Sequence, residues 1–151
     1  MLKVRLMHED RAKKDVREAE ERQKKAEKSL EACQEELARY RIWRPEEEDR
    51  RYAAIFGKPM DAKKLATFRE ELACLAQGEV ERELKVHEAE KVVQQRVTET
   101  EAARKAAIMA RRASMKLEEH RDIWQAAMRK EEERLSDLEM EESRGPAKNS
   151  L

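Results

Sequence analysis

The spacing of apolar residues in the first quarter of the chain most constrains how it can fold. Alternate steps of three and four from Leu2 give twelve positions, nine of which are apolar or aromatic. Charged residues flank these positions, which is the heptad pattern typical of a coiled coil. No Gly or Pro interrupts residues 1–44, so we expect a helix about 60 Å long at 1.5 Å per residue. The twelve positions are Leu2, Arg5, Glu9, Ala12, Val16, Ala19, Gln23, Ala26, Leu30, Cys33, Leu37 and Tyr40.

The same spacing returns at Leu65 and continues to Leu138, where fifteen of twenty-two positions are apolar. Gly78 is the one weak point, because glycine costs about 1 kcal/mol against alanine inside a helix and can mark a kink. The positions are Leu65, Phe68, Leu72, Leu75, Glu79, Arg82, Val86, Ala89, Val93, Arg96, Thr100, Ala103, Ala107, Ala110, Ser114, Leu117, Arg121, Trp124, Met128, Glu131, Leu135 and Leu138.

The composition excludes an ordinary globular core. Charged residues make up 45% of the 151 residues and aromatic residues 4%, whereas globular domains have about 25% charged residues. Lysine plus arginine and aspartate plus glutamate are both 34, so the net charge is zero and gives no sign of nucleic-acid binding. Neither apolar stripe can be buried by its own helix, and each therefore needs a partner.

Helix-breaking residues gather between the two patterns, in residues 40–77. Pro45 lacks a backbone donor and disfavours helical geometry at the preceding residue, so we expect the first arm to kink or stop there. Gly57-Lys58-Pro59 is the strongest turn signal in the chain. Asp61 is well placed as the N-cap of the next helix.

These signals predict an all-α fold, a long antiparallel two-helix coiled-coil hairpin whose aromatic turn region is kinked or broken. The expected single domain covers residues 1–142, with arm one at 2–56, the turn at 57–60 and arm two at 61–142. The tail 143–151 is polar and contains breakers, so we expect it to be disordered.

Two registers are compatible with the pattern. In the first, residue i faces roughly residue 116 − i, so Leu2 lies near Ser114 and residues 115–142 project as a single helix. That projection would leave an apolar stripe uncovered, which is typical of a docking surface. In the second, residues 61–77 form a small head and the N-terminal arm pairs with the C-terminus. The stripe left uncovered in the first register holds Leu117, Trp124, Met128, Leu135 and Leu138.

The two ends of the chain differ in charge. Residues 1–30 contain ten basic and seven acidic residues, while residues 129–142 contain seven acidic and three basic residues. Blocks of this kind are usually solvated helix faces. The alternative is electrostatic steering towards a partner of opposite charge.

No catalytic, cofactor or metal site is expected, and we predict that the protein is not an enzyme. His8, His87 and His120 are isolated on predicted helices, with no Cys or second His one turn away to bind zinc. The two cysteines form no disulfide framework, and no glycine-rich loop suggests a phosphate site. The absence of a membrane-length apolar run and of a signal-peptide pattern predicts a cytoplasmic protein.

Recognition of other proteins is the remaining function, and aromatic residues near the turn and in arm two are the candidates. Those at the turn could plug the end of the hairpin or could form a partner-binding tip, since Trp, Tyr and Arg are enriched at interface hot spots. Trp124 has the same two interpretations, as a seam residue or as an exposed anchor. The candidate partner-binding residues are Trp43, Arg44, Tyr52, Phe56, Phe68, Trp124 and Met128.

The segments YRIWRPEEEDRRY and AKKLATFREELACLAQGE, on either side of the turn, resemble the YscO family of type III secretion proteins. The overall length and the charged helical arms agree with that family as well. The residues that carry the resemblance are Tyr40, Trp43, Arg44, Glu47, Glu48 and Tyr52 before the turn, and Lys64, Leu65, Phe68, Ala73 and Leu75 after it.

The resemblance implies a non-enzymatic component on the cytosolic face of the secretion apparatus, similar to the flagellar protein FliJ and to the stalk subunit of rotary ATPases. It implies a central stalk in the hexameric secretion ATPase, linked to the membrane-embedded export-gate protein. Export chaperones and the needle-length ruler protein are further implied partners. By analogy, the end with the termini enters the ring and the aromatic turn faces the gate.

Other functions fit a charged hairpin. One alternative is a generic coiled-coil scaffold or tether, which would pair between molecules. Another is a chaperone-like clamp that holds clients between its arms. The turn inside a continuing heptad pattern favours an intramolecular hairpin, so we expect a monomer in isolation, with no nucleic-acid partner and no insertion into a membrane.

Overall fold

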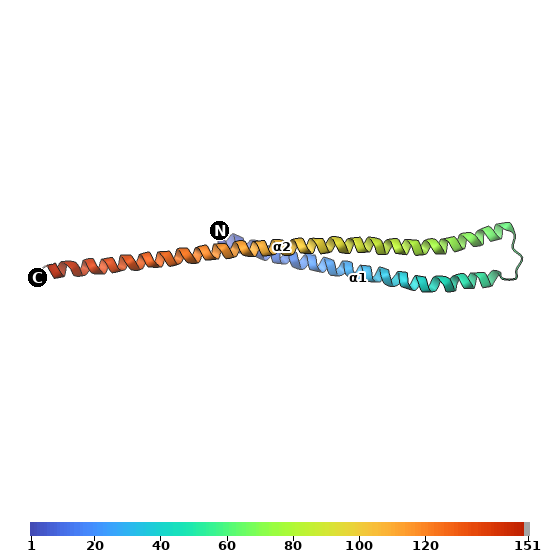
Figure 1. Cartoon of the computed structure of the whole chain (residues 1–151), viewed down its shortest axis with the longest axis horizontal. Coiled ribbons are helices and arrows are strands. Elements are labelled where there is room, and N and C mark those ends of the chain that lie inside the picture. The colour runs from blue at the N-terminus through green and yellow to red at the C-terminus, as the bar shows by residue number, and fades with distance from the viewer. Residues whose placement is uncertain (150–151) are drawn as a thin grey trace. The chain divides into compact units, whose positions relative to one another are not determined.

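The described part of the chain consists of two α-helices joined by a short turn, as seen in a computed structural model (Figure 1). Helix α1 spans Leu2–Ile55 and helix α2 spans Ala62–Asn149. The structure describes the backbone of residues 1–149 and the side chains of residues 1–144. It divides into two units: the turn unit, residues 15–103, and the terminal unit, residues 1–14 with α2 from residue 104 onward.

Within the turn unit, α1 and α2 run antiparallel in the hairpin that the heptads predict (Figure 1). The Tyr40 hydroxyl reaches the Leu75 carbonyl, and Arg22 pairs with Glu99 at 4.0 Å. In the terminal unit, Ser114 bonds Glu9. The numbers of facing residues therefore add to about 120, whereas the predicted register has a sum of about 116. The difference is roughly one helical turn of 3.6 residues. These contacts correspond to the first of the two predicted registers and not to the head-forming one.

The predicted heptad positions form the seam between the helices. Eleven of the twelve predicted α1 positions are buried or half-buried, and the exception is Arg5. In α2, each predicted position from Phe68 to Leu117 is buried or half-buried, whereas Leu65 is exposed. We call the α2 positions from Phe68 to Leu117 the covered seam.

Small side chains occupy the most buried positions of the covered seam and several buried positions on α1. Ala19 and Ala26 are buried on α1, and Thr100 and Ser114 are each only 1% exposed on α2. The Thr100 hydroxyl donates to the Arg96 carbonyl at 2.9 Å, and the Ser114 hydroxyl donates to Glu9 Oε2 at 2.7 Å. Small residues bury little apolar area, so each such layer stabilises less than a leucine layer would.

The turn follows its sequence signals. Helix α1 ends at Ile55, and Gly57 has a φ of 74°, a left-handed conformation that glycine adopts without strain. Asp61 caps α2, because its Oδ1 accepts a hydrogen bond from the Lys64 backbone N–H at 2.7 Å. The observed turn is within one residue of the predicted 57–60 at each end.

We predicted a kink or a stop at Pro45, and of these two outcomes the stop does not occur, because helix α1 continues through this residue. Figure 1 shows the helix curving through this segment without a break. Proline removes one backbone hydrogen bond, and side chains of the adjoining turns form ion pairs along α1. Arg44 Nε bonds Glu48 at 2.8 Å, and both Arg50 and Arg51 bond Glu47. The Arg44–Glu48 pair spans Pro45, and the Glu47 pairs join the two turns that follow it.

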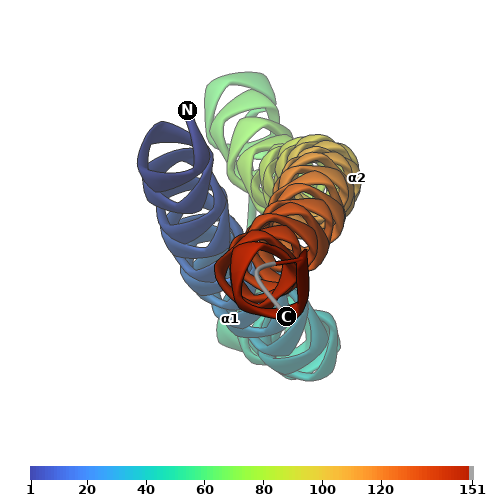
Figure 2. The ribbon, with the colours of Figure 1, turned by 90° about the vertical axis from the view of Figure 1, so that its left-hand side faces the viewer.

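In the terminal unit, the dark-blue start of α1 lies beside the orange part of α2 in two views (Figures 1 and 2). All described side chains of residues 119–144 are exposed. Helix α2 extends to Asn149, past the Glu142 end that we predicted, because extending an existing helix is much easier than starting one. The remaining part of the predicted disordered tail, residues 150–151, lies outside the described residues.

Candidate functional site

Two aromatic pairs lie near the turn. Tyr52 of α1 meets Phe68 of α2 edge to face, with ring centroids 5.1 Å apart and an interplanar angle of 72°. Phe68 is only 8% exposed, whereas Tyr52 is about half exposed. Tyr40 and Trp43, on consecutive turns of α1, lie 5.4 Å apart. Edge-to-face pairs add to the energy of area burial, so Phe68 is part of the core at this end.

Tyr40 explains the glycine inside α2. Its hydroxyl donates to the Leu75 carbonyl at 2.6 Å, and a Cβ at position 78 would overlap that hydroxyl and the ring. Arg82 covers the ring from 4.0 Å and donates from Nη1 to the Gly78 carbonyl at 2.9 Å. Gly78 is therefore a contact site for Tyr40 rather than a kink, a role that sequence reasoning missed.

Arg44 connects the two helices. Its Nη1 donates to Glu79 on α2 at 3.1 Å, while its Nε bonds Glu48 on α1. The hydrogen bond that Arg44 donates to Glu48 raises the pKa of Arg44, with Glu79 adding to the effect. Arg41 pairs with the same Glu79 at 3.7 Å and with Glu83 at 2.9 Å. The Arg44 guanidinium thus already has two carboxylate partners within the chain.

A second ion-pair group lies nearer the turn. Arg51 pairs with Glu47 at 3.1 Å and reaches Glu71 on α2 at 3.4 Å. Hydrogen bonds from Arg50 and then from Arg51 lower the pKa of Glu47. Partly exposed ion pairs are individually weak, but a network of them fixes the register of the two helices.

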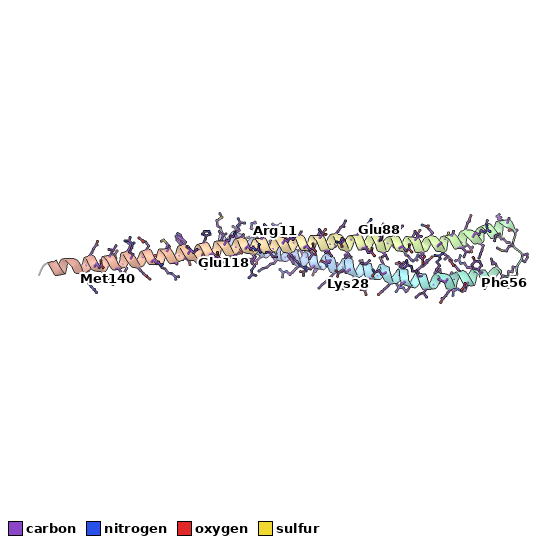
Figure 3. All side chains as sticks on the ribbon, viewed as in Figure 1. Arg11, Lys28, Phe56, Glu88, Glu118 and Met140 are labelled. Atoms are coloured by element: carbon purple, nitrogen blue, oxygen red, sulfur yellow. The ribbon has the colours of Figure 1, made fainter. Side chains whose placement is uncertain are left out.

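The turn surface is the exposed part of this end. Phe56 is 89% exposed and lies at the turn, where Figure 3 labels it. Beside it, an open hollow of about 480 Å³ is lined by Ile55, Met60 and Phe68, with Lys63 and Lys64 among the polar residues. The aromatic residues thus divide by position: Phe68 is core, Trp43 and Tyr52 are half exposed, and Phe56 is open to solvent. We call Phe56 and this hollow the turn surface.

The second candidate surface lies on α2 in the terminal unit. Heptad positions past Leu117 have no helix beside them among the described residues, and Trp124 is 63% exposed. Met128 is also exposed, as are Ile123 and Met140 next to the heptad line; Figure 3 labels Met140. We call these heptad positions the free stripe: Arg121, Trp124, Met128, Glu131, Leu135 and Leu138.

The charged members of the free stripe have partners only on their own helix in the described part of the chain. Arg121 lies 3.6 Å from Asp122, and Glu131 accepts two hydrogen bonds from Arg134, the shorter at 2.7 Å. That bond raises the pKa of Arg134. Such exposed local pairs are easily exchanged for contacts with another molecule.

The described residues contain no group of three or more side chains that could hold a metal ion. His8, His87 and His120 are all exposed, and His87 lies 3.4 Å from Glu90. Cys33 and Cys74 are free thiols. Within the part of the chain that the structure covers, no helix has the length and apolarity needed to span a membrane.

Comparison with known proteins identifies the family of this chain. The family model described as type III secretion protein YscO matches residues 1–145. Among solved structures, the chain is similar to the crystal structure at 2.8 Å of type III secretion protein YscO from Vibrio parahaemolyticus, with 28% sequence identity and a TM-score of 0.87. The similarity covers 93% of this chain and 89% of that one. A search of curated proteins finds no match. The chain therefore belongs to the YscO family and is a component of type III secretion.

Proposed function

We propose that this chain is the central stalk of the secretion ATPase hexamer, on the cytoplasmic face of the secretion apparatus. In this role it links the ATPase ring to the export-gate membrane protein and has no enzymatic activity of its own. A stalk needs long helices with contact surfaces for more than one partner, and this chain has two paired helices, a turn surface on one unit and a free stripe on the other.

The observation that carries the proposal is the free stripe. It continues the heptad spacing of the covered seam, yet its apolar residues Trp124, Met128, Leu135 and Leu138 are all exposed. An amphipathic helix with an uncovered apolar face is suited to docking in a groove or lumen of another protein. We assign this face to the ATPase ring.

The turn surface is assigned to the export gate. Phe56 and the hollow beside Phe68 offer an apolar anchor and a depression with lysines at its edge. Aromatic anchors of this kind contribute a large share of the energy of many interfaces. Trp43 and Tyr52, which are half exposed on the same unit, extend the assigned surface along α1.

The experiment measures ATP hydrolysis and ring assembly by the cognate secretion ATPase with and without the purified chain. We expect the chain to stimulate hydrolysis, and Trp124→Ala with Met128→Ala to abolish the stimulation. Phe56→Ala is the control, because it removes an exposed apolar side chain on the other surface. It should keep the stimulation and lose binding to the cytoplasmic domain of the gate.

The proposal fails if the unaltered chain changes neither hydrolysis nor ring assembly and captures neither the ATPase nor the gate domain. Export chaperones and the needle-length ruler protein are the further proposed partners. Their binding is tested separately by pull-down with the same variants. A variant that loses chaperones but still stimulates the ATPase would show that escort and stalk roles use different residues.

A further inference from the structure

The free stripe has a charge pattern that the stalk role does not use. Two oppositely charged residues, Arg121 and Glu131, enclose two apolar ones, Trp124 and Met128, and all four are exposed. We propose that a second copy of this chain docks antiparallel on the free stripe, over residues 121–131. The second copy and the ATPase ring would cover the same side chains, Trp124 and Met128, so one contact excludes the other. The test of the dimer contains no ATPase, and its outcome is therefore independent of the stalk role.

The pairing follows from how antiparallel coiled-coil helices interlock. Each a position of one helix lies against a d position of the other, and in a two-fold interface each contact occurs twice. Applied to residues 121–131, this rule sets Arg121 against Glu131 of the second copy. It sets Trp124 against Met128 of the second copy. Every apolar residue then meets an apolar one, and each charge meets its opposite.

Other registers lack this match. A shift of one heptad sets Met128 against Glu131 of the second copy and Arg121 against Leu138 of the second copy. Parallel pairing in register sets Arg121 against Arg121 and Glu131 against Glu131, and facing like charges oppose association. Interfaces gain specificity when the wrong arrangements bring like or unpaired charges together. Charge complementarity therefore selects the antiparallel register.

The flanking segments support the same arrangement. Past residue 131, the second copy would run beside the N-terminal part of α1 in the terminal unit. Residues 132–142 contain six acidic residues and one basic residue, whereas residues 1–14 contain five basic and two acidic residues. Val4 and Met7 are exposed on α1, and Arg11 follows one turn later. The acidic segment 132–142 of the second copy and the basic segment 1–14 have opposite charge, which favours contact between them.

Two flanking pairs limit the strength of the association. In this register Glu118 lies near Glu132 of the second copy, and His120 lies near Arg134 of the second copy. The neighbouring like charges of the glutamates weaken the dimer without favouring another register. We therefore expect monomers in dilute solution and dimers as the concentration rises.

The first experiment is sedimentation equilibrium of the full chain over a range of concentrations. The mass should rise from 17.8 kDa to twice that value. Arg121→Glu and Glu131→Arg should each remain monomeric, because each places like charges in both charged layers. An equimolar mixture of the two variants should dimerise again, since both layers then hold opposite charges. All three samples should have the helical content of the unaltered chain, because both positions are exposed.

Two results would overturn the proposal. One is a mass of 17.8 kDa for the unaltered chain at every concentration. The other is a dimer that the single variants do not weaken, which would show that copies pair through another face.

A second experiment tests the direction of the helices with a short bifunctional maleimide. In a background with Cys33→Ala and Cys74→Ala, Ala127→Cys should crosslink efficiently, because position 127 lies near its own copy across the two-fold axis. Ser136→Cys is the matched control, since position 136 lies far from that axis. Equal crosslinking of the two variants would contradict antiparallel pairing in this register.

Discussion

The covered seam and the free stripe have the same heptad spacing on one helix, but different surroundings. From Phe68 to Leu117 the heptad positions of α2 are buried or half-buried against α1, and from Arg121 to Leu138 all are exposed. The most buried residues of the covered seam are small and polar, namely Thr100 and Ser114. Heptad spacing thus identifies a face that needs covering, and its position relative to the other arm decides whether the chain covers it.

The largest expected contrast comes from one aromatic residue on each surface. Phe68→Ala should lower the free energy of unfolding by about 3 kcal/mol, because it removes a buried ring that packs against Tyr52. Trp124→Ala should change it by less than about 0.5 kcal/mol, as is usual for an exposed side chain. Urea unfolding followed by circular dichroism, at a concentration that keeps the chain monomeric, measures both. Equal losses of unfolding free energy in the two variants would show that Trp124 is packed against another part of the chain and that the free stripe is covered.

Gly78 tests how closely the covered seam is packed. Gly78→Ala should destabilise by about 1–3 kcal/mol, because the new methyl group overlaps the Tyr40 hydroxyl. That loss would exceed the gain of about 1 kcal/mol in helix propensity.

Tyr40→Phe provides the control for Gly78. In the Gly78→Ala background it should recover part of the stability, since the hydroxyl oxygen is the atom closest to the added methyl group. In the unaltered chain it should cost about 1 kcal/mol, because the bond to the Leu75 carbonyl is lost. A stabilising Gly78→Ala would contradict the observed packing.

Glu9 gives a smaller, pH-dependent effect at the start of α1. The Ser114 hydroxyl, with help from Lys13 and Arg111, lowers the pKa of Glu9. A lowered carboxyl pKa stabilises the fold above the ordinary value of 4.5 and loses that contribution as the pH falls through the folded-state value. The melting temperature of Glu9→Gln should therefore lie below that of the unaltered chain at pH 7, and the gap should close towards pH 3. A gap independent of pH would assign the effect to packing.

The smallest effect on stability should come from Phe56→Ala. Its side chain is 89% exposed, so the free energy of unfolding should change by less than about 0.5 kcal/mol. Binding to the export-gate domain, measured by calorimetry, should nevertheless fall strongly. Unchanged binding would remove the turn surface from the proposed gate contact.

Much of the architecture was predictable because it depends on local rules. The 3-4 spacing identified the covered seam almost position by position, and Asp61 and Gly57 have the predicted roles at the turn. The register was displaced by about one turn, because the turn geometry sets it and the pattern repeats with each heptad.

The remaining differences involve contacts between residues far apart in sequence. Pro45 was expected to kink or stop α1, and the continuation of the helix with the Arg44–Glu48 ion pair across the proline could not be read from proline chemistry alone. Gly78 was interpreted by its propensity, whereas its role depends on Tyr40 on the other helix. The contact between Gly78 and Tyr40 could have been predicted only from the correct register of the two helices. Their residue numbers add to nearly the same value as those of the other facing pairs. The division of the turn aromatics into core and exposed residues likewise required the side-chain packing.

The most direct test of the central claim is amide hydrogen exchange of the dilute chain, alone and with the cognate secretion ATPase. Residues 68–117 should exchange slowly in both samples, because the covered seam is already packed. Residues 121–138 should exchange faster in the chain alone and slow markedly when the ATPase is added. Unchanged exchange in residues 121–138, under conditions where the ATPase is bound, would contradict the claim that the free stripe is the docking face.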